Sequence, residues 1–264
     1  MTPLRAPVDA QAAPSLDGVR LPEPVVLLGI PFAPLSFGEA AAQIGSMLAS
    51  DRPHRVVLAN AHTLNLAQRD RTYHTTLRTA SLVLRDGLGV ELAAWLCGWH
   101  LRHNFVGTDF VPDVLAALAS RQPSVFLYGA APGVAERAAK TLAERAPGIR
   151  IVGTEHGYGD PQVAVERVAS NRPDVLLVAL GNPRQEQWIA DNLERLEVRV
   201  AIGVGALFDY LAGRVRRAPR VVLALRSEWI FRLIVEPRRL WRRYLIGNVE
   251  FLWHVARAGR GARP

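Results

Sequence analysis

The chain has 264 residues, of which 49% are hydrophobic and 21% are charged. These values fit one large α/β domain, alone or with an appendage, and they exclude a disordered, collagen-like or low-complexity chain. The single cysteine, Cys97, excludes a disulfide framework and a cysteine-based zinc site. The longest apolar runs, such as Val200–Phe208, fall far short of the roughly 18 residues that a membrane span needs. No secretory signal is visible at the N-terminus, so we expect a cytoplasmic chain that touches a membrane at most from one side.

The net charge of +8 is unevenly distributed along the chain. Residues 214–264 contain 13 arginines and three glutamates, a net charge of +10, whereas residues 1–213 have a net charge of −2. All of the excess positive charge therefore belongs to the last fifth of the chain. Such a segment is expected to meet an anionic partner, either a membrane surface or a nucleic acid.

Short apolar segments alternate with helical patterns from residue 25 to residue 204. Strands are predicted at 25–28, 55–59, 81–84, 125–128, 149–152, 175–180 and 200–204. Helices are predicted from the capping box Ser36-Phe-Gly-Glu39 to Leu48, at 61–70, from Gly89 to Leu96, and at 113–120, 134–143, 163–169 and 185–193. This alternation predicts an α/β fold with a Rossmann-like parallel sheet and helices on both faces.

Three regions are expected from these patterns. Residues 1–23 are rich in proline and alanine and predict a disordered tail. Residues 24–213 form the α/β catalytic domain, and residues 214–264 form a basic C-terminal appendage with helices at 220–235 and 238–255, divided by Pro237. The second helix is amphipathic and basic: Leu240, Tyr244, Gly247 and Phe251 share one stripe, beside Arg239, Arg242 and Arg243.

Ligands of parallel α/β sheets bind at the carboxyl ends of the strands, where loops present backbone amides and helix N-termini. Five strand-end loops here have unusual sequences. They are Asn60-Ala-His62-Thr63, Asp86-Gly87-Leu-Gly89, Gly129-Ala-Ala-Pro-Gly133, Gly181-Asn-Pro183-Arg-Gln185-Glu186 and Gly203-Val-Gly205-Ala-Leu-Phe-Asp209. The glycines suit close approach by phosphates, although neither a complete dinucleotide fingerprint nor a Walker loop is present, and tight turns explain them equally well.

Among the acidic residues, Asp86 is the best candidate for proton transfer. It follows a strand and precedes two glycines, so its carboxylate is expected at the mouth of the sheet, where it can accept a proton from a hydroxyl group. The alternative is that Asp86 caps the following helix, and Asp209 has the same two interpretations. Gln185 and Glu186 either cap a helix or bind sugar hydroxyls, and His62 is a lone histidine near this region.

These loops resemble the WecG/TagA/CpsF glycosyltransferase family (glycosyltransferase family 26), over about residues 25–251. The similar motifs are Asp86-Gly-Leu-Gly-Val90, Val106-Gly107-Thr-Asp109, Val125-Phe-Leu-Tyr-Gly129-Ala-Ala-Pro-Gly133 and Val178-Ala-Leu-Gly181-Asn-Pro183-Arg-Gln185-Glu186. Further motifs follow in order: Gly203-Val-Gly205, Phe208-Asp209, Gly213, Arg217-Ala-Pro219, Glu228-Trp229, Arg232 and Glu236-Pro-Arg-Arg239.

The resemblance implies an inverting hexosyltransferase that moves a sugar from a UDP-sugar to a lipid-diphosphate-linked saccharide in cell-envelope or exopolysaccharide synthesis. It implies that Asp86 is the general base, that Gln185 lies in the active site, and that neither a metal nor a cofactor is required. Arg232, Arg239 and Arg242 would then meet the membrane and complete the site. The substrate-binding residues expected are Asn60, His62, Thr63, Gly87, Gly107, Asp109, Gly129, Gly133, Gly181, Pro183, Gln185, Glu186, Gly203 and Gly205.

Two positions depart from the family pattern. Leu58 stands where the family usually has threonine, and Asn104 stands where it usually has arginine. A hydroxyl and a cation expected near the substrates are thus absent. This favours a subfamily with a different donor or acceptor, and the alternative is a degenerate, non-catalytic paralogue that binds nucleotide sugar and membrane.

The expected partners are a UDP-sugar, a polyprenyl-diphosphate-linked saccharide and the anionic inner leaflet of the cell membrane, where the protein would be peripheral. Self-association is left open, and so is a purely structural role in which the apolar stripe packs on the α/β domain. No nucleic acid is expected, because large aromatic and aliphatic residues share the basic helices. A nicotinamide-dependent oxidoreductase is the weaker enzymatic alternative, because the glycine fingerprint is incomplete.

Overall fold

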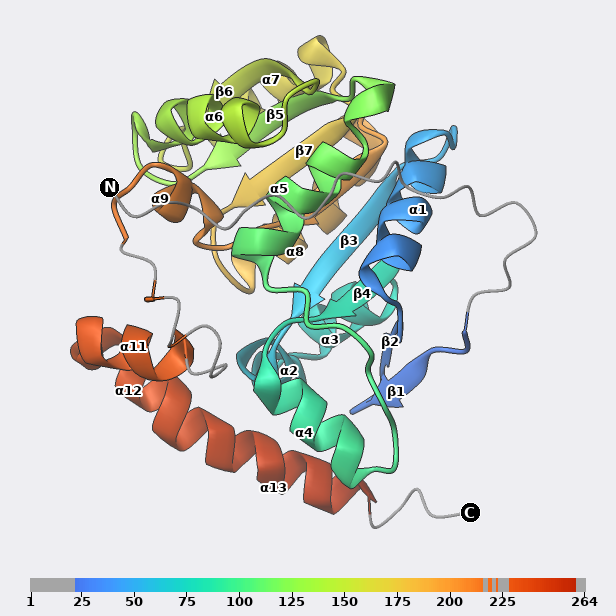
Figure 1. Cartoon of the computed structure of the whole chain (residues 1–264), viewed down its shortest axis with the longest axis vertical. Coiled ribbons are helices and arrows are strands. Elements are labelled where there is room, and N and C mark those ends of the chain that lie inside the picture. Colours follow the sequence, from blue (N-terminus) through green and yellow to red (C-terminus); the bar gives the residue numbers. More distant parts are fainter. Residues whose placement is uncertain (1–21, 216–217, 220–221, 223–227, 260–264) are drawn as a thin grey trace.

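The computed structural model describes residues 22–215, 218–219, 222 and 228–259. The tail predicted at 1–23 lies almost entirely outside the described residues, as does most of the segment 216–227. The described part combines a parallel α/β domain with a group of C-terminal helices that lies along one side of it (Figure 1).

The predicted parallel sheet is confirmed. Its six strands have the order β4-β3-β8-β7-β5-β6, and every neighbouring pair is parallel. All six carboxyl ends therefore lie at the same edge. The strands are β3 (His54–Ala59), β4 (Leu82–Arg85), β5 (Ser124–Gly129), β6 (Arg150–Glu155), β7 (Val175–Ala179) and β8 (Val200–Gly203).

Helices cover both faces of this sheet, as predicted. One face packs on α1 (Phe37–Leu48), α5 (Gly107–Ala117), α6 (Val134–Arg145) and α9 (Leu207–Leu211). The other face packs on α2 (Ala61–Arg69), α3 (Arg71–Arg78), α4 (Leu88–Leu96), α7 (Pro161–Asn171) and α8 (Arg184–Asn192). Strand side chains alternate between the two cores: Leu58 belongs to the first, and Val57 and Ala59 belong to the second.

Three local features differ from the sequence prediction. The strand predicted at 25–28 is β1 (Val25–Leu27), which turns at Leu28 and Gly29 into an antiparallel partner, β2 (Ile30–Phe32). Helix α3 was not predicted; Asp70 ends α2 and its side chain caps α3. Helix α5 spans Gly107–Ala117 rather than the predicted 113–120, and Pro112 lies inside it.

The C-terminal segment contains α11 (Glu228–Val235), α12 (Pro237–Trp241), a π-helical turn (Arg242–Ile246) and α13 (Gly247–Gly259). Pro237 divides the helices as predicted, in the first turn of α12 where its missing N–H costs least. The π-helical turn interrupts the single helix predicted at 238–255. The start predicted at residue 220 lies outside the described residues.

The stripe on the second C-terminal helix faces the α/β domain. Leu240 and Phe251 are buried, and Phe251 shares a core with α2 and α4. Asn65 of α2 donates a hydrogen bond from Nδ2 to the carbonyl oxygen of Gly247 at 2.7 Å. The stripe is thus packed on the α/β domain, which was one of the arrangements left open by the sequence. A partner of these helices would therefore meet their opposite side.

Candidate active site

Four helices of nine or more residues begin at the carboxyl edge of the sheet without a side-chain cap. Helices α4, α5, α6 and α8 begin after Gly87, Val106, Gly133 and Pro183, and none of these residues makes a capping hydrogen bond through a side chain. Helix N-termini combine free N–H groups with the positive end of the helix dipole. This edge therefore has several positions suited to an anionic ligand such as a diphosphate.

Asp86 lies directly after β4 at this edge, and its side chain is only partly buried. Its backbone N–H donates to the carbonyl oxygen of Ala59 at 2.9 Å, which extends the pairing of β4 with β3. Its Oδ2 accepts a hydrogen bond from Asn60 Nδ2 at 3.3 Å. The N-cap residue of α4 is Gly87, so Asp86 does not occupy the helix-cap position that was its alternative interpretation.

Asn104 and Arg85 hold the turn that follows Asp86. Asn104 Oδ1 accepts a hydrogen bond from the Gly87 N–H at 2.7 Å, and Gly87 has a φ of 90°, which favours glycine. Arg85 is buried and donates to the carbonyl oxygens of Leu101 and His103, and also to Glu91 in the first turn of α4. These contacts fix the Asp86 carboxylate relative to α4 and to the loop before α5.

The strands β5 and β7 end in a second group of predicted residues. The chain leaves β5 toward the sheet edge at β6 and leaves β7 toward β8, so the connections diverge, as at the ligand-binding crevices of open α/β sheets. A Cβ at Gly129 would lie 2.4 Å from the carbonyl oxygen of Ala179, so only glycine fits this approach. The start of the Gly129–Gly133 loop therefore packs directly against the end of β7, two residues before Gly181.

Gln185 links the loops that follow β7 and β8. Its Oε1 accepts hydrogen bonds from the backbone N–H groups of Gly181 and Gly205, at 3.1 and 3.0 Å. Two backbone donors at Oε1 fix the orientation of the amide, so Nε2 is the group that donates to Glu186 at 2.7 Å. A Cβ at Gly203 would lie 2.8 Å from this Nε2. Gln185 is 2% exposed, so in this structure it binds the loops themselves.

Glu186 is a buried carboxyl group that accepts three hydrogen bonds. Oε1 accepts from Gln185 Nε2 and from Asn182 Nδ2, and Oε2 accepts from the Tyr73 hydroxyl at 3.0 Å. Burial raises the pKa of Glu186 to about 7, and the hydrogen bonds from Gln185, Tyr73 and Asn182 oppose that rise. Burial also raises the pKa of Tyr73. In this geometry Glu186 positions α3 and the β7 loop, while the predicted contact with substrate remains a prediction.

Asn60 and Thr63 form a capping box at the start of α2, in which each side chain accepts from the other residue's N–H. His62 lies in the same turn. Its pKa is lowered to about 4, first by burial and then by Arg243 and Arg69, so it is neutral near pH 7. Neutral imidazole can both donate and accept hydrogen bonds. Of this group, the structure brings Asn60 next to Asp86.

Leu58 packs beneath the start of α5. A Cβ at Gly107 would lie 3.1 Å from Leu58 Cδ1, so this leucine fills the space beside the α5 N-terminus, where Asp109 lies in the first helical turn. Thr108, between Gly107 and Asp109, has a buried hydroxyl oxygen with no hydrogen-bond partner among the described residues. The departure at position 58 therefore changes the packing directly beneath an uncapped helix N-terminus.

The predicted membrane residues lie in the C-terminal helices. Arg242 begins the π-helical turn, is exposed, and has its guanidinium carbon 5.3 Å from the ring centroid of Trp241. Arg232 and Arg239 belong to α11 and α12, and their side chains lie outside the described part of the structure. The arginine and the neighbouring aromatic ring share one exposed surface, which is typical of contact with lipid headgroups.

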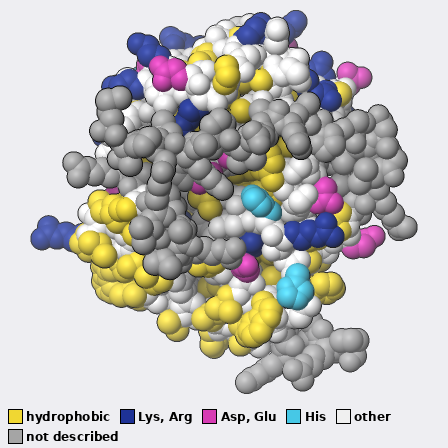
Figure 2. Space-filling model, in the orientation of Figure 1, with side chains coloured by type: hydrophobic (Ala, Val, Ile, Leu, Met, Phe, Trp, Pro, Cys, Tyr) yellow, Lys and Arg dark blue, Asp and Glu magenta, His cyan; other side chains and the backbone are white. Residues whose placement is uncertain are grey.

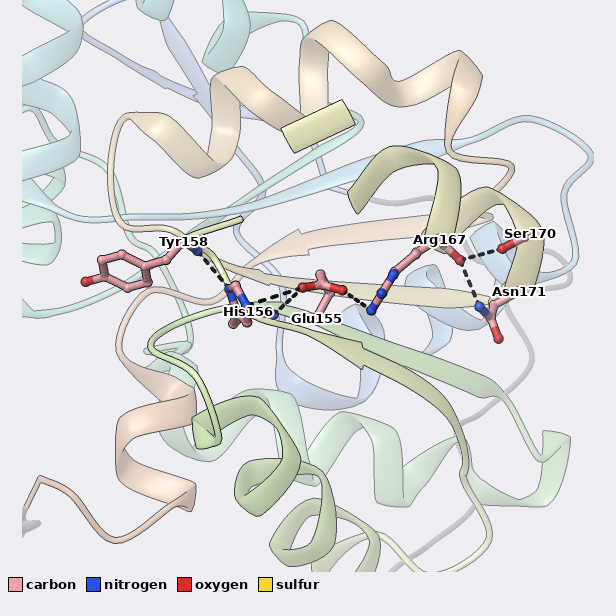
Figure 3. A network of polar contacts seen from close by, with 6 residues as sticks. All are labelled: Glu155, His156, Tyr158, Arg167, Ser170 and Asn171. Carbon is pink, nitrogen blue, oxygen red and sulfur yellow. Dashed lines mark hydrogen bonds and ion pairs between the residues drawn. The ribbon is translucent and has the colours of Figure 1, made fainter. Parts of the chain in front are cut away.

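A polar network at the carboxyl end of β6 was missed by the sequence analysis (Figure 3). Glu155 binds Arg167 of α7, and His156 Nδ1 accepts from the Tyr158 N–H at 3.2 Å, while the Tyr158 ring points away from the network. The adjacent Gly157 N–H donates to the carbonyl oxygen of Ala130 at 2.9 Å. The network therefore fixes the β6–α7 loop against the loop that follows β5.

Within residues 22–215, 218–219, 222 and 228–259, no group of three or more His, Cys, Asp or Glu side chains is arranged to hold a metal ion. The same residues include no helix with the length and apolarity that crossing a bilayer requires.

An aspartate at the carboxyl edge of a parallel sheet, next to several uncapped helix N-termini, is an arrangement that suits an α/β enzyme with an anionic substrate. The chain matches the Glycosyl transferase WecG/TagA/CpsF family over residues 25–264. It belongs to this family, and the predicted glycosyltransferase class, with hexosyltransferase relatives, is confirmed.

Several curated relatives share one name, N-acetylglucosaminyldiphosphoundecaprenol N-acetyl-beta-D-mannosaminyltransferase. The chain is 34% identical to that of Bacillus spizizenii over 191 residues, 72% of this chain and 74% of the relative. It is 34% identical to that of Bacillus subtilis over 180 residues, 68% and 70% of the two chains. Identity to that of Staphylococcus aureus is 30% over 240 residues, 89% and 93% of the two chains.

Four positioning residues escaped the sequence analysis: Tyr73, Arg85, Asn104 and Asn182. Asn104 was noted only for the arginine that it replaces, and its role at Gly87 depends on a contact 17 residues away. Tyr73 lies in a helix that was not predicted and meets Glu186 113 residues later. Asn182 is the exception, since an amide four residues before Glu186 at a helix start is a local signal.

Proposed function

We propose that this glycosyltransferase moves a sugar from a UDP-sugar to a saccharide linked through diphosphate to a polyprenyl lipid, with inversion at the anomeric carbon. The relatives' shared name includes an acceptor of this kind, N-acetylglucosaminyldiphosphoundecaprenol. The observation that favours this role for the site is the placement of Asp86 on the same sheet edge as the uncapped N-termini of α4, α5, α6 and α8.

The donor diphosphate would lie against these helix N-termini. Their N–H groups are already oriented, so they can stabilise the negative charge that develops on UDP as the glycosidic bond breaks. The β5–β7 crevice and the end of β4 are separated by about 14 to 19 Å, from a spacing of about 4.8 Å between neighbouring strands. That span suits an elongated ligand with its nucleotide at the crevice and its sugar near Asp86.

Asp86 would act as the general base. Its carboxylate removes the proton of the acceptor hydroxyl as that oxygen attacks the anomeric carbon, and the bond from that carbon to the UDP oxygen breaks on the opposite face. UDP leaves with the electron pair of that bond, and the proton remains on Asp86 until it is released to solvent. Asn60, which donates to Oδ2, would hold the carboxylate in the orientation needed.

The decisive variant is Asp86→Asn, with Asp51→Asn as its control. Asp51 is exposed, just before β3 at the opposite edge of the sheet, so the control makes the same chemical change away from the site. We expect Asp86→Asn to bind UDP-sugar, by saturation-transfer NMR, and to lose at least about a hundredfold in transfer to a diphosphate-linked acceptor. Transfer at the rate of the Asp51→Asn enzyme would refute the assignment.

A panel of UDP-sugars would identify the donor. Each sugar is tested for UDP release with and without the lipid-linked acceptor, and for NMR saturation transfer. Binding with transfer supports the enzymatic proposal. Binding without transfer for every donor and acceptor would favour the non-catalytic paralogue. Leu58 beside the α5 N-terminus predicts that the preferred donor differs from that of relatives with threonine there.

The C-terminal helices would hold the enzyme on the anionic inner leaflet of the cell membrane. Their exposed side carries large apolar residues, among them Ile234, Leu245, Ile246 and Val249, together with the exposed Arg242. Each suitably placed arginine adds up to about 1 kcal/mol on an anionic surface. Because Phe251 and Val255 belong to the core, the membrane test is better made by charge reversal than by truncation.

Arg242→Glu is expected to weaken sedimentation with anionic vesicles and to leave retention on nucleic acid unchanged. Arg78→Glu is the control, because Arg78 is exposed at the end of α3, away from the C-terminal helices and from the candidate site. Equal binding of both variants to anionic vesicles would contradict the proposed membrane role of these helices.

A further inference from the structure

Helix α4 has an exposed face composed of large apolar side chains. Leu92, Trp95 and Leu96 of the helix are 46, 60 and 57% exposed, and Trp99, just after its end, is 51% exposed. These four residues are called the exposed face of α4, and the segment from Leu92 to Trp99 contains no charged residue. The opposite face, with Val90, Ala93 and Ala94, is buried in the core. A helix that is apolar on all sides is normally buried on all sides, so one open face points to a further partner.

This face is continuous with the exposed side of α13. The two helices are in contact, since a Cβ on Gly89 of α4 would lie 4.0 Å from Phe251 of α13. On α13, Val249, Leu252 and Trp253 are exposed. Figure 2 shows hydrophobic side chains gathered along the lower edge of the molecule, where Figure 1 places α4 and the C-terminal helices.

The charges around this surface favour an anionic lipid headgroup layer. Arg257 lies over the ring of Trp253, with its guanidinium carbon 5.3 Å from the centroid. The acidic residues of α4 and α13 are paired with arginines of the α/β domain: Glu91 with Arg85, and Glu250 with Arg69. Arg257 therefore lies at the α13 side of this surface, tryptophans line it, and Glu91 and Glu250 are paired, a combination suited to a bilayer interface.

The position of α4 connects this surface to the chemistry. The helix begins at Leu88, immediately after Asp86 and Gly87, and Leu92 lies only about 6 Å further along its axis. A saccharide attached to the membrane by a lipid diphosphate would thus reach Asp86 close to the plane of the headgroups. An enzyme attached only through its C-terminal helices would have no such constraint on the height of Asp86.

We propose that α4 is a second membrane-binding element, whose exposed face of Leu92, Trp95, Leu96 and Trp99 enters the headgroup layer of an anionic bilayer beside α13. The inference rests on the proposed membrane role of the C-terminal helices. The exposed face of α4, the helix that begins two residues after Asp86, would then be covered by lipid rather than by a second copy of the chain.

The single cysteine provides the test, because Cys97 is exposed at the end of α4. The full-length protein is labelled there with an environment-sensitive fluorophore and mixed with vesicles of phosphatidylcholine and phosphatidylglycerol. We expect a blue shift of emission and quenching by nitroxide-labelled lipid. Sedimentation with the vesicles but no shift and no quenching would overturn the proposal for α4, while leaving the role of the C-terminal helices intact.

A variant with both Trp95→Ser and Trp99→Ser should bind the same vesicles roughly tenfold more weakly or worse, since two large apolar side chains leave the contact. Tyr158→Ser is the matched control, an aromatic that is 78% exposed on the β6–α7 loop at the other end of the molecule. Circular dichroism checks that each variant is folded. Unchanged vesicle binding by the double variant, or a dimer in light scattering that the double variant abolishes, would contradict lipid as the occupant.

Discussion

The side-chain oxygen of Asn104 lies 2.7 Å from the backbone nitrogen of Gly87, and this hydrogen bond joins the loop before α5 to the turn that follows Asp86. Sequence comparison alone marks Asn104 as a lost arginine. In the structure Asn104 has a role of its own, because its side-chain oxygen accepts the N–H of Gly87, which has a φ of 90°. The loop and the turn are held as one unit.

We therefore predict that Asn104→Ala lowers kcat about tenfold while the protein stays folded, because the Asp86 carboxylate loses its fixed orientation. Asn104→Asp keeps an oxygen acceptor and should retain more activity than Asn104→Ala. Steady-state transfer assays with circular dichroism provide the measurement. If Asn104→Arg, which introduces the residue usual in the family, were more active than the wild type, the positioning role would be wrong.

Gln185 and Gly203 form a second pair whose coupling can be measured. Gln185→Ala leaves the Gly181 and Gly205 N–H groups without their acceptor and should cost about 2 to 4 kcal/mol of unfolding free energy. Gly203→Ala pushes the Gln185 amide out of place and should cost about 1 to 3 kcal/mol.

Because both changes break the same contact, urea unfolding of the double variant should show a loss smaller than the sum of the two single losses. Gly38→Ala is the control, since a Cβ at this helical position meets nothing within 4 Å. Strict additivity of the two site variants would show that Gln185 and Gly203 act independently.

Much of this architecture follows from local sequence signals. The parallel sheet was predictable because each strand is a short apolar run followed by a helical pattern, and the Ser36–Glu39 capping box fixed the start of α1. Asp86 at the strand end was predictable for the same reason. Helix α3 was missed because the prediction ended the helix at residue 70, where Asp70 ends α2 and its side chain also caps a second short helix directly after it.

The long-range contacts could not be read from the sequence. The Gly247 carbonyl is bound by Asn65, 182 residues earlier, and nothing in the amphipathic pattern of 238–255 says whether its stripe meets lipid or protein. The exposure of Leu92 and Trp95 could likewise not be predicted, because an apolar helix in an α/β pattern is normally buried on both sides. Only the packing of α13 shows which faces remain open.

Glu186 predicts a pH dependence of stability. Its pKa is raised from the ordinary 4.5 to about 7 by burial, so the folded state binds more protons than the unfolded state between these values. Glu186 therefore adds up to about 3 kcal/mol to the free energy of unfolding below pH 4.5. This contribution is lost as the pH rises from 4.5 through 7. Glu186→Gln, which stays neutral and can still accept from Gln185 and Asn182, should lack this loss.

The measurement is urea unfolding of both proteins from pH 4 to pH 8. The difference in unfolding free energy should move in favour of Glu186→Gln as the pH rises through this range, and level off above about pH 7. A difference that does not change with pH would mean that the carboxyl group titrates alike in the folded and unfolded chains.

Chelation tests how the leaving group is stabilised. In the mechanism proposed here, the N–H groups of the helix N-termini oppose the charge of the departing UDP. Transfer should therefore continue at an unchanged rate after treatment with EDTA. Activity that is lost with EDTA and restored by Mg²⁺ would contradict this mechanism.

The anchor between α2 and α13 should control the stability of the C-terminal helices. Asn65 is 4% exposed, and Asn65→Ala removes its hydrogen bond to Gly247 and leaves a small void beneath the π-helical turn. We expect a loss of about 1 to 2 kcal/mol and faster hydrogen exchange throughout α13, because the Arg69–Glu250 ion pair, which also joins α13 to α2, is partly exposed and contributes little. Asn171→Ala, at the exposed end of α7, is the control. Exchange in α13 that matches the control would show that the buried residues Phe251 and Val255 hold the helix without this hydrogen bond.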